Sequence, residues 1–242
     1  ILALLAGPRM TFALNYSGLC LNGTNGYYLV WQGKDHNDIV GDPFINGVYS
    51  ENYVRWLDGC QYGGDSFSLG ANLSGSTNAR LVQLGYGRSQ GDYLKFYWTT
   101  SDSSGGVSDV PNWMPAPIEN HKYWFLIDGS ISGKWRYCIR DLTAGSAEAC
   151  NSTQSRTWTN GYLAWWAYET YNTKTVMGTS GSDPAATITS PRYHYGSFAN
   201  TWTFRTGMPS CARTGNPPAK YACHVYSATY SKDAFYVNTT GP

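Results

Sequence analysis

The sequence is poor in charge, and the charge that it has is balanced. Only 14% of the 242 residues are charged, and 17 Lys and Arg stand against 16 Asp and Glu, so the net charge is +1. Proteins that bind nucleic acid or anionic membranes need a basic patch, which this balance does not provide. Aromatic residues make up 16% of the chain, which excludes a disordered protein, and strong helix formers are scarce. We therefore expect a β-rich globular protein that binds neither nucleic acid nor a membrane.

No long hydrophobic run is present. The chain opens on the apolar segment Ile1–Gly7, which is far shorter than the ~20 residues of a membrane helix. Such a segment fits the end of a secretory signal peptide, or an apolar strand within residues 1–12. As a strand it would pack on its own sandwich or add to the sheet edge of a neighbouring copy, and the second arrangement would produce a homopolymer.

The six cysteines lack the spacing of metal sites. None stands in a Cys-x-x-Cys pair or at zinc-finger distance from a histidine, so we expect disulfides and neither a structural metal nor a cofactor. Turn-like stretches lie between Cys138 and Cys150 and between Cys211 and Cys223, which favours these two pairs. The remaining cysteines, Cys20 and Cys60, would then form the third pair. Spacing alone leaves about 15 pairings open.

Asn-x-Ser/Thr sequons accompany the cysteines, although such tripeptides also arise by chance in a chain rich in Asn, Ser and Thr. The five sequons begin at Asn15, Asn22, Asn72, Asn151 and Asn238. Disulfides and N-glycosylation both belong to the secretory pathway. Together they predict a secreted or cell-surface glycoprotein.

Short runs rich in Val, Ile, Tyr, Phe and Trp alternate with clusters of Gly, Asn, Asp and Ser, which is the pattern of strands joined by turns. The predicted strands are Tyr27–Gln32, Tyr53–Leu57, Ser66–Leu69, Arg80–Tyr86, Tyr93–Thr99, Lys122–Ile127, Lys134–Arg140, Gly161–Tyr171, Phe198–Phe204 and Phe235–Val237. Ser101–Pro117 and Pro209–Lys220 are predicted as loops. No repeat or linker divides the chain, so we predict one all-β domain over residues 1–242, an antiparallel two-sheet sandwich or barrel.

Few residues stand where they could carry chemistry. The sequence has no Gly-x-Ser-x-Gly elbow, phosphate-binding glycine loop, HExxH motif or EF-hand loop, and disulfide-bonded cysteines offer no spare thiol. Three of the four glutamates, Glu51, Glu119 and Glu148, stand in polar stretches that resemble turns. We interpret these three as solvated surface carboxylates.

The fourth glutamate, Glu169, stands in the most aromatic predicted strand. Alternation places it on one face with Trp165 and Ala167, and partial desolvation among aromatic rings raises the pKa of a carboxyl toward a range useful for acid–base catalysis. Gln83 is a second polar residue in an apolar strand, on one face with Gly85. Two ordinary interpretations stay open, a strand-end glutamate that reaches solvent or an arginine, and a glutamine hydrogen-bonded on a sheet surface.

Two segments resemble the neprosin-type proteins. Leu81–Asp102 is similar to a pattern near I-E/Q-A-G-W … G-D … F-x-Y-W-T-S-D, with matches at Gln83, Gly85, Gly91, Asp92, Tyr97, Trp98, Thr99 and Asp102. Trp166–Gly178 resembles W-G-G-E-V-x-N … T-x-M-G, with matches at Trp166, Glu169, Asn172, Met177 and Gly178.

The resemblance implies a fold and an activity. Neprosin-type proteins and the fungal glutamic peptidases (eqolisins) share an antiparallel jelly-roll sandwich, and both are secreted peptidases that work at acid pH. The former use two glutamates and the latter a glutamine with a glutamate, so the implied catalytic pair is Gln83 and Glu169. The sequence departs from both patterns, because Ala167 and Tyr168 replace two glycines and a glutamate in the fungal position would fall on Trp165.

The implied mechanism uses a water between the two side chains and a peptide substrate, with proline-rich sequences as the first candidates. Ionised Glu169 takes a proton from the water as it attacks the carbonyl, Gln83 donates to the oxyanion, and Glu169 then protonates the leaving amine. Trp98 and Trp165 are expected to stack on apolar or proline side chains of the substrate. Core packing is the other interpretation of both tryptophans.

Two functions of other classes stay open. Jelly rolls with aromatic faces also serve as carbohydrate-binding modules, since a fold does not fix a function. A non-catalytic surface protein that polymerises into an extracellular filament through Ile1–Gly7 would equally suit the sequons and the low charge. A peptidase requires Gln83 and Glu169 within reach of one water, whereas a filament requires a neighbouring chain on the N-terminal segment.

Overall fold

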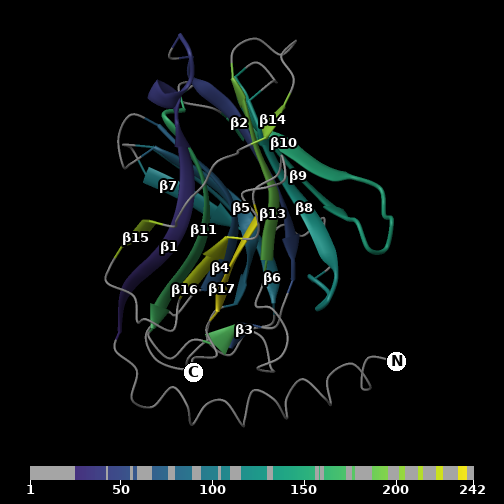
Figure 1. Ribbon diagram of the computed structural model, residues 1–242. Coiled ribbons are helices and arrows are strands. Elements are labelled where there is room, and N and C mark those ends of the chain that lie inside the picture. The colour runs from purple at the N-terminus through teal and green to yellow at the C-terminus, as the bar shows by residue number, and fades with distance from the viewer. Residues whose placement is uncertain are drawn as a thin grey trace.

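A computed structural model shows two β-sheets packed face to face (Figure 1). It describes residues 25–41, 43–54, 57–58, 67–75, 80–88, 94–102, 105–109, 116–129, 133–155, 158, 161–172, 176–177, 187–195, 202–204, 212–214, 222–225 and 234–238. For several strand residues, Glu169 among them, it describes the backbone pairing and not the side chain.

Seven strands form the first sheet within the described residues, and every pairing in it is antiparallel. In spatial order they are β15 (Ala212–Thr214), β1 (Asn25–Asp35), β11 (Leu163–Asn172), β4 (Phe67–Ser74), β5 (Leu81–Arg88), β6 (Lys95–Asp102) and β7 (Gly105–Asp109). Because β11, β4 and β5 lie in the middle, residues far apart in the sequence become direct neighbours on this sheet.

The second sheet is also antiparallel. Its strands are β10 (Ala149–Ser155), β9 (Lys134–Asp141), β8 (Lys122–Asp128), β2 (Ile45–Tyr53), β13 (Thr187–Tyr195), β17 (Ala234–Asn238) and β16 (Ala222–Val225), with β14 (Thr203–Phe204) paired to β13. The short strands β3 (Leu57–Asp58) and β12 (Val176–Met177) pair separately, and a 3-10 helix spans His36–Asp38.

Aromatic side chains fill the space between the sheets. Phe96 of the first sheet packs against Phe125 and Tyr123 of the second, with ring centroids 5.9 and 5.1 Å apart. Polar atoms cross the same space: the Trp166 indole N–H donates to the carbonyl oxygen of Tyr49 at 2.8 Å. Hydrophobic burial and satisfied polar groups therefore hold the two sheets together.

The predicted fold class is confirmed, since the described chain is an antiparallel two-sheet sandwich. Three of the longer strands, β2, β10 and β13, were not predicted. Strand β13 contains Pro191, and proline is unfavourable in an interior strand because it has no N–H to donate. The structure places Pro191 at a β-bulge, where the register with β2 shifts and Ser190 has a φ of 52°.

Other predictions of local structure need correction. The strand predicted over Tyr53–Leu57 is wrong, because β2 ends at Tyr53. The predicted loops Ser101–Pro117 and Pro209–Lys220 contain the edge strands β7 and β15. Both edge strands are short and rich in small or polar residues, so they carry little of the apolar pattern by which strands are predicted. The single-domain assignment stays a prediction.

Candidate functional site

Gln83 lies in the middle of β5, on the face of the first sheet that is turned away from the second sheet. Its neighbours Val82 and Leu84 are fully buried in the core, so alternation turns Gln83 to the opposite face, which we call the outer face. Its register partners are Asn72 on β4 and Thr99 on β6. The half-buried Gln83 side chain is therefore directed away from the core at the centre of a broad sheet.

The position of Glu169 belongs to the same face. Glu169 pairs with Ser68 of β4, and Ser68 pairs with Gly87 of β5. Gly87 is four residues beyond Gln83, and residues an even number apart share a face of a strand. The structure thus brings positions 83 and 169 to one face, with β4 between their strands.

The row of paired residues between these two positions is made of the smallest side chains. Ala167 of β11 pairs with Gly70 of β4, which pairs with Gly85 of β5. We call these three residues the small-residue row. Because none of them has a side chain beyond Cβ, none obstructs longer side chains that reach over the row from either side.

The register sets the distance that a catalytic pair would have to bridge. A strand spacing of about 4.8 Å and a rise of about 3.3 Å per residue place the Cα atoms of Gln83 and Glu169 about 16 Å apart. Extended glutamine and glutamate side chains reach roughly 5 Å each. With both side chains laid along the line between the two positions, the shortest gap is about 6 Å, close to the length of two hydrogen bonds to one shared water.

The two candidate tryptophans occupy different environments. Trp98 is 2% exposed in the core, where its ring lies 5.3 Å from that of Tyr137. This placement assigns Trp98 to core packing. Trp165 lies on the outer face, in a register row with Asn72 and Gln83, and is 8% exposed.

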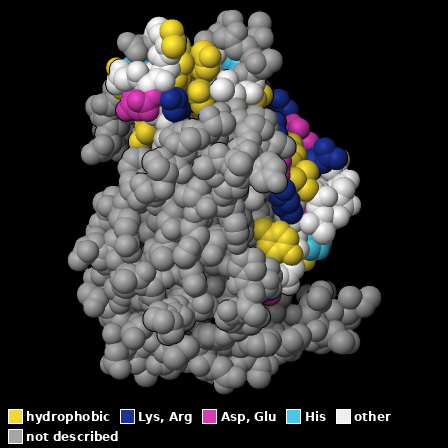
Figure 2. Space-filling view, in the orientation of Figure 1, with side chains coloured by type: hydrophobic (Ala, Val, Ile, Leu, Met, Phe, Trp, Pro, Cys, Tyr) yellow, Lys and Arg dark blue, Asp and Glu magenta, His cyan; other side chains and the backbone are white. Residues whose placement is uncertain are grey.

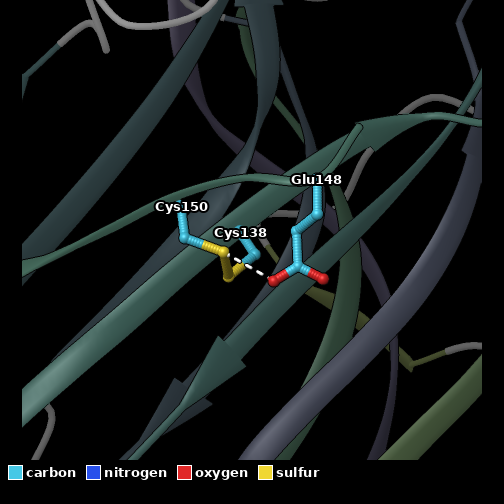
Figure 3. Close-up of side chains that lie close together, drawn as sticks. All are labelled: Cys138, Glu148 and Cys150. Carbon is cyan, nitrogen blue, oxygen red and sulfur yellow. Dashed lines mark hydrogen bonds between the residues drawn. A yellow bond between two sulfur atoms is a disulfide. The ribbon is translucent and has the colours of Figure 1, made fainter. Parts of the chain in front are cut away.

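One of the three expected disulfides is present in the described residues. Cys138 and Cys150 are direct partners on β9 and β10 and are joined by a disulfide, with their Cα atoms 4.1 Å apart. Figure 3 shows the Glu148 carboxylate beside the bridge, with one oxygen 2.7 Å from Cys150 Sγ. A disulfide sulfur carries no proton, so we treat this approach as a contact and not as a hydrogen bond.

These three side chains do not form a metal site in the oxidised protein. Their ligand-type atoms lie within 4.8 Å of one another, but both sulfurs are consumed by the bridge and cannot act as thiolates. The Glu148 carboxylate instead pairs with Arg136 at 2.5 Å.

The described part of the structure includes some of the predicted cysteines and sequons fully, some by their backbone only, and others not at all. Asn151 is half-buried on the edge strand β10. For three residues only the backbone is placed, in β4, β16 and β17: Asn72, Cys223 and Asn238. Outside the described residues lie Asn15, Asn22, Cys20, Cys60, Cys211 and the segment Ile1–Gly7.

The interpretation of Glu51 as a turn residue is wrong. Glu51 lies within β2, opposite Trp124, where it accepts a hydrogen bond from the Tyr49 hydroxyl at 3.1 Å and pairs with Lys122. Burial and the neighbouring Glu51 charge raise the pKa of Tyr49. Charged side chains gather on the right of the view in Figure 2, the side on which β8, β9 and β10 lie in Figure 1. The alternation within residues 45–53 was the signal that could have identified the strand.

Sequence reasoning also missed a buried polar cluster at the start of β8. His121 Nδ1 lies 2.7 Å from Asp141 Oδ2, and the other carboxylate oxygen accepts from the Ala144 N–H at 2.9 Å. Burial raises the pKa of Tyr123 to about 12. The two residues of the His121–Asp141 pair are 20 apart in the sequence, and only the pairing of β8 with β9 brings them together.

Within the described residues, no helix is long and apolar enough to cross a membrane. No protein-family profile matches the sequence, and no curated protein matches it.

Solved structures do resemble this protein. Scytalido-glutamic peptidase with a peptide-based transition-state analogue superposes with a TM-score of 0.53 at 10% identity, covering 89% of this chain and 100% of that chain. The same enzyme with a transition-state-analogue inhibitor gives a TM-score of 0.51 at 10% identity, with the same coverage. The chain therefore has a glutamic-peptidase-like fold.

Proposed function

We propose that this protein is a secreted peptidase of the glutamic type, similar to the neprosin-type proteins, in which Glu169 is the general base and Gln83 stabilises the oxyanion. One observation carries the proposal: in a fold like that of the glutamic peptidases, the register brings Gln83 and Glu169 to one face across the small-residue row. Scytalido-glutamic peptidase, which has this fold, was solved with a peptide-based transition-state analogue, and this supports a peptide as the substrate class.

The mechanism needs no group other than the two side chains and a water. The ionised Glu169 carboxylate takes one proton from the water as the water oxygen bonds to the carbonyl carbon of the substrate. The Gln83 amide N–H donates to the oxygen that becomes negative. The protonated Glu169 then transfers its proton to the leaving nitrogen as the C–N bond breaks. Because the base must be ionised while the amine leaves protonated, we expect activity at weakly acid pH.

Two features support secretion. The disulfide between Cys138 and Cys150 is of a kind that persists in oxidising compartments. The sequon at Asn151 lies on the edge strand β10, where a glycan would meet a neighbouring strand on one side only.

The test is hydrolysis of a proline-rich protein at about pH 4, near the ordinary pKa of a glutamate carboxyl. We expect Glu169→Gln to lower kcat by roughly 10²- to 10⁴-fold, because it preserves shape and removes the base. Gln83→Ala should lower kcat by about 10²- to 10³-fold through loss of the oxyanion donor. Glu51→Gln is the matched control, since it makes the same change in a strand of the second sheet.

Three results would contradict the proposal: no cleavage by the wild type, full activity of Glu169→Gln, or an equal loss of activity in Glu51→Gln. A folded wild type that cleaves nothing would leave a binding or filament-forming protein with a glutamic-peptidase-like fold. Binding to a glycan array and sedimentation of the full chain would then separate these two possibilities.

A further inference from the structure

A second apolar cluster lies on the outer face, apart from the core. It consists of the buried residues Trp165 and Ala167 with the half-buried Leu81 and Leu163 packed against them. Their strand neighbours, such as Trp166, point the opposite way into the core. The cluster therefore does not contribute to packing between the sheets, and it lies beside Gln83.

A hydrogen bond fixes the ring at the centre of this cluster. The Trp165 indole N–H donates to the Ser74 hydroxyl at 2.8 Å. In the register, Ser74 stands between Leu163 on β11 and Leu81 on β5. The indole N–H is therefore directed toward the row of these two leucines and away from the small-residue row.

Charge is distributed unevenly on the two sides of the small-residue row. On the Glu169 side, the row across the central strands also includes Lys95 at the position opposite Gly87. On the Gln83 side, the two successive rows across β11, β4, β5 and β6 hold no ionisable residue: Trp165, Asn72, Gln83 and Thr99, then Leu163, Ser74, Leu81 and Ser101. Across these four strands, a bound peptide chain would thus meet charge on one side and an uncharged surface with Trp165, Leu163 and Leu81 on the other, and the nearest ionisable residue on that side is Asp35 of β1, the register partner of Leu163.

We infer that the half-buried Leu81 and Leu163, packed on the buried Trp165 and Ala167, form a specificity subsite that takes an apolar side chain of the peptide substrate, next to the bond that is cleaved. Ser74 is a positioning residue, since it acts on the substrate through the Trp165 ring that it holds. The inference rests on the proposed function and goes further, because it names the side-chain class that the site selects.

The experiment uses the full chain and a set of peptides that differ at one position near the cleaved bond, with Leu, Lys or Glu. We expect wild-type kcat/KM to be highest for the leucine peptide. Ser74→Ala should lower kcat/KM for that peptide roughly 3- to 10-fold, mainly through a higher KM, the range expected for loss of one hydrogen bond. The values for the lysine and glutamate peptides should change little, so selectivity falls.

Two control variants separate positioning from other effects of Ser74. Ser74→Thr keeps the hydroxyl and should preserve selectivity. Ser74 also completes the sequon that begins at Asn72, so Asn72→Gln, which removes the sequon and leaves the Ser74 hydroxyl, should likewise preserve selectivity. An independent test of the subsite is Leu163→Lys, which places a positive charge in it and should change the preferred peptide from the leucine peptide to the glutamate peptide.

Each outcome decides between distinct possibilities. A wild type that cleaves none of the peptides overturns the proposed function and the subsite with it. A wild type that cleaves them all without preference for leucine overturns the subsite alone. Unchanged selectivity in both Ser74→Ala and Leu163→Lys also overturns the subsite. Selectivity that is lost in Ser74→Ala and kept in Ser74→Thr supports the subsite.

Discussion

The carboxylate of Asp141 provides the sharpest test of the structure that does not depend on catalysis. It is 6% exposed and accepts hydrogen bonds from the backbone N–H of Ala144 and from the His121 ring. Burial alone would raise the pKa of Asp141, but hydrogen bonds from Ala144, His121 and Tyr123 more than offset it, so the pKa lies below its ordinary value of 3.8. The folded state therefore favours the ionised form.

The size and the pH dependence of the effect follow from this environment. Asp141→Asn keeps the shape and one acceptor oxygen but replaces charge-assisted hydrogen bonds by weaker neutral ones, a loss of about 2 kcal/mol. A carboxyl whose pKa is depressed in the folded state contributes stability that is fully present above its unfolded pKa of about 3.9 and is lost as the pH falls through the folded value. The difference between wild type and variant should thus be full at neutral pH and shrink below about pH 4.

Urea unfolding of wild type and Asp141→Asn at several pH values measures this difference directly. The control is Asp38→Asn, because Asp38 is 62% exposed in an i,i+4 pair with Lys34 at 3.8 Å and should contribute no more than about 0.5 kcal/mol at any pH. A difference for Asp141→Asn that is below about 0.5 kcal/mol at neutral pH, or that grows as the pH falls below about 4, would refute the reasoning.

Two further predictions concern the second sheet. An alanine Cβ at Gly47 would lie 2.7 Å from Trp202 Cη2, so Gly47→Ala should destabilise the protein by about 1–3 kcal/mol in thermal unfolding. The loss should be smaller when Trp202 is also replaced by alanine. Additive effects of the two substitutions would contradict this packing. The disulfide joins residues 12 apart in the sequence, so the double variant Cys138→Ala, Cys150→Ala should lose about 3 kcal/mol of unfolding free energy. The control is the reduced wild type, which should lose the same amount if the bridge alone is responsible. A double variant as stable as the oxidised wild type would contradict the estimate of loop entropy.

Much of the fold could be predicted because its signals are local. Runs rich in Val, Ile, Tyr, Phe and Trp between turn residues identified strands such as β5, β8 and β9, and the Cys138–Cys150 pair followed from a turn between two cysteines. Strand β13 could not be found in this way, because Pro191 is tolerated only through a bulge that exists once β2 is paired alongside. Sheet order is likewise a long-range property, which no window of the sequence contains.

The candidate site shows the same division between local and long-range information. The residue types at Gln83 and Glu169 were evident from the sequence, and alternation placed each on a strand face. The role of Ser74 was not, because its bond to Trp165 joins residues 91 apart in the sequence. The burial of Trp98 also depends on the second sheet, since its neighbour Tyr137 lies on β9.

The register also clarifies which carboxylate a glutamic mechanism could use. Position 165 shares the row of Gln83, and a glutamate there would lie directly across β4 from the glutamine, with Cα atoms about 10 Å apart. That position is a tryptophan, and Glu169 is the one acidic residue of β11. The base must then reach over the small-residue row, where Ala167, Gly70 and Gly85 themselves present no side chain beyond Cβ. Under the proposed function, a larger side chain at any position of this row would stand between the general base and the oxyanion donor.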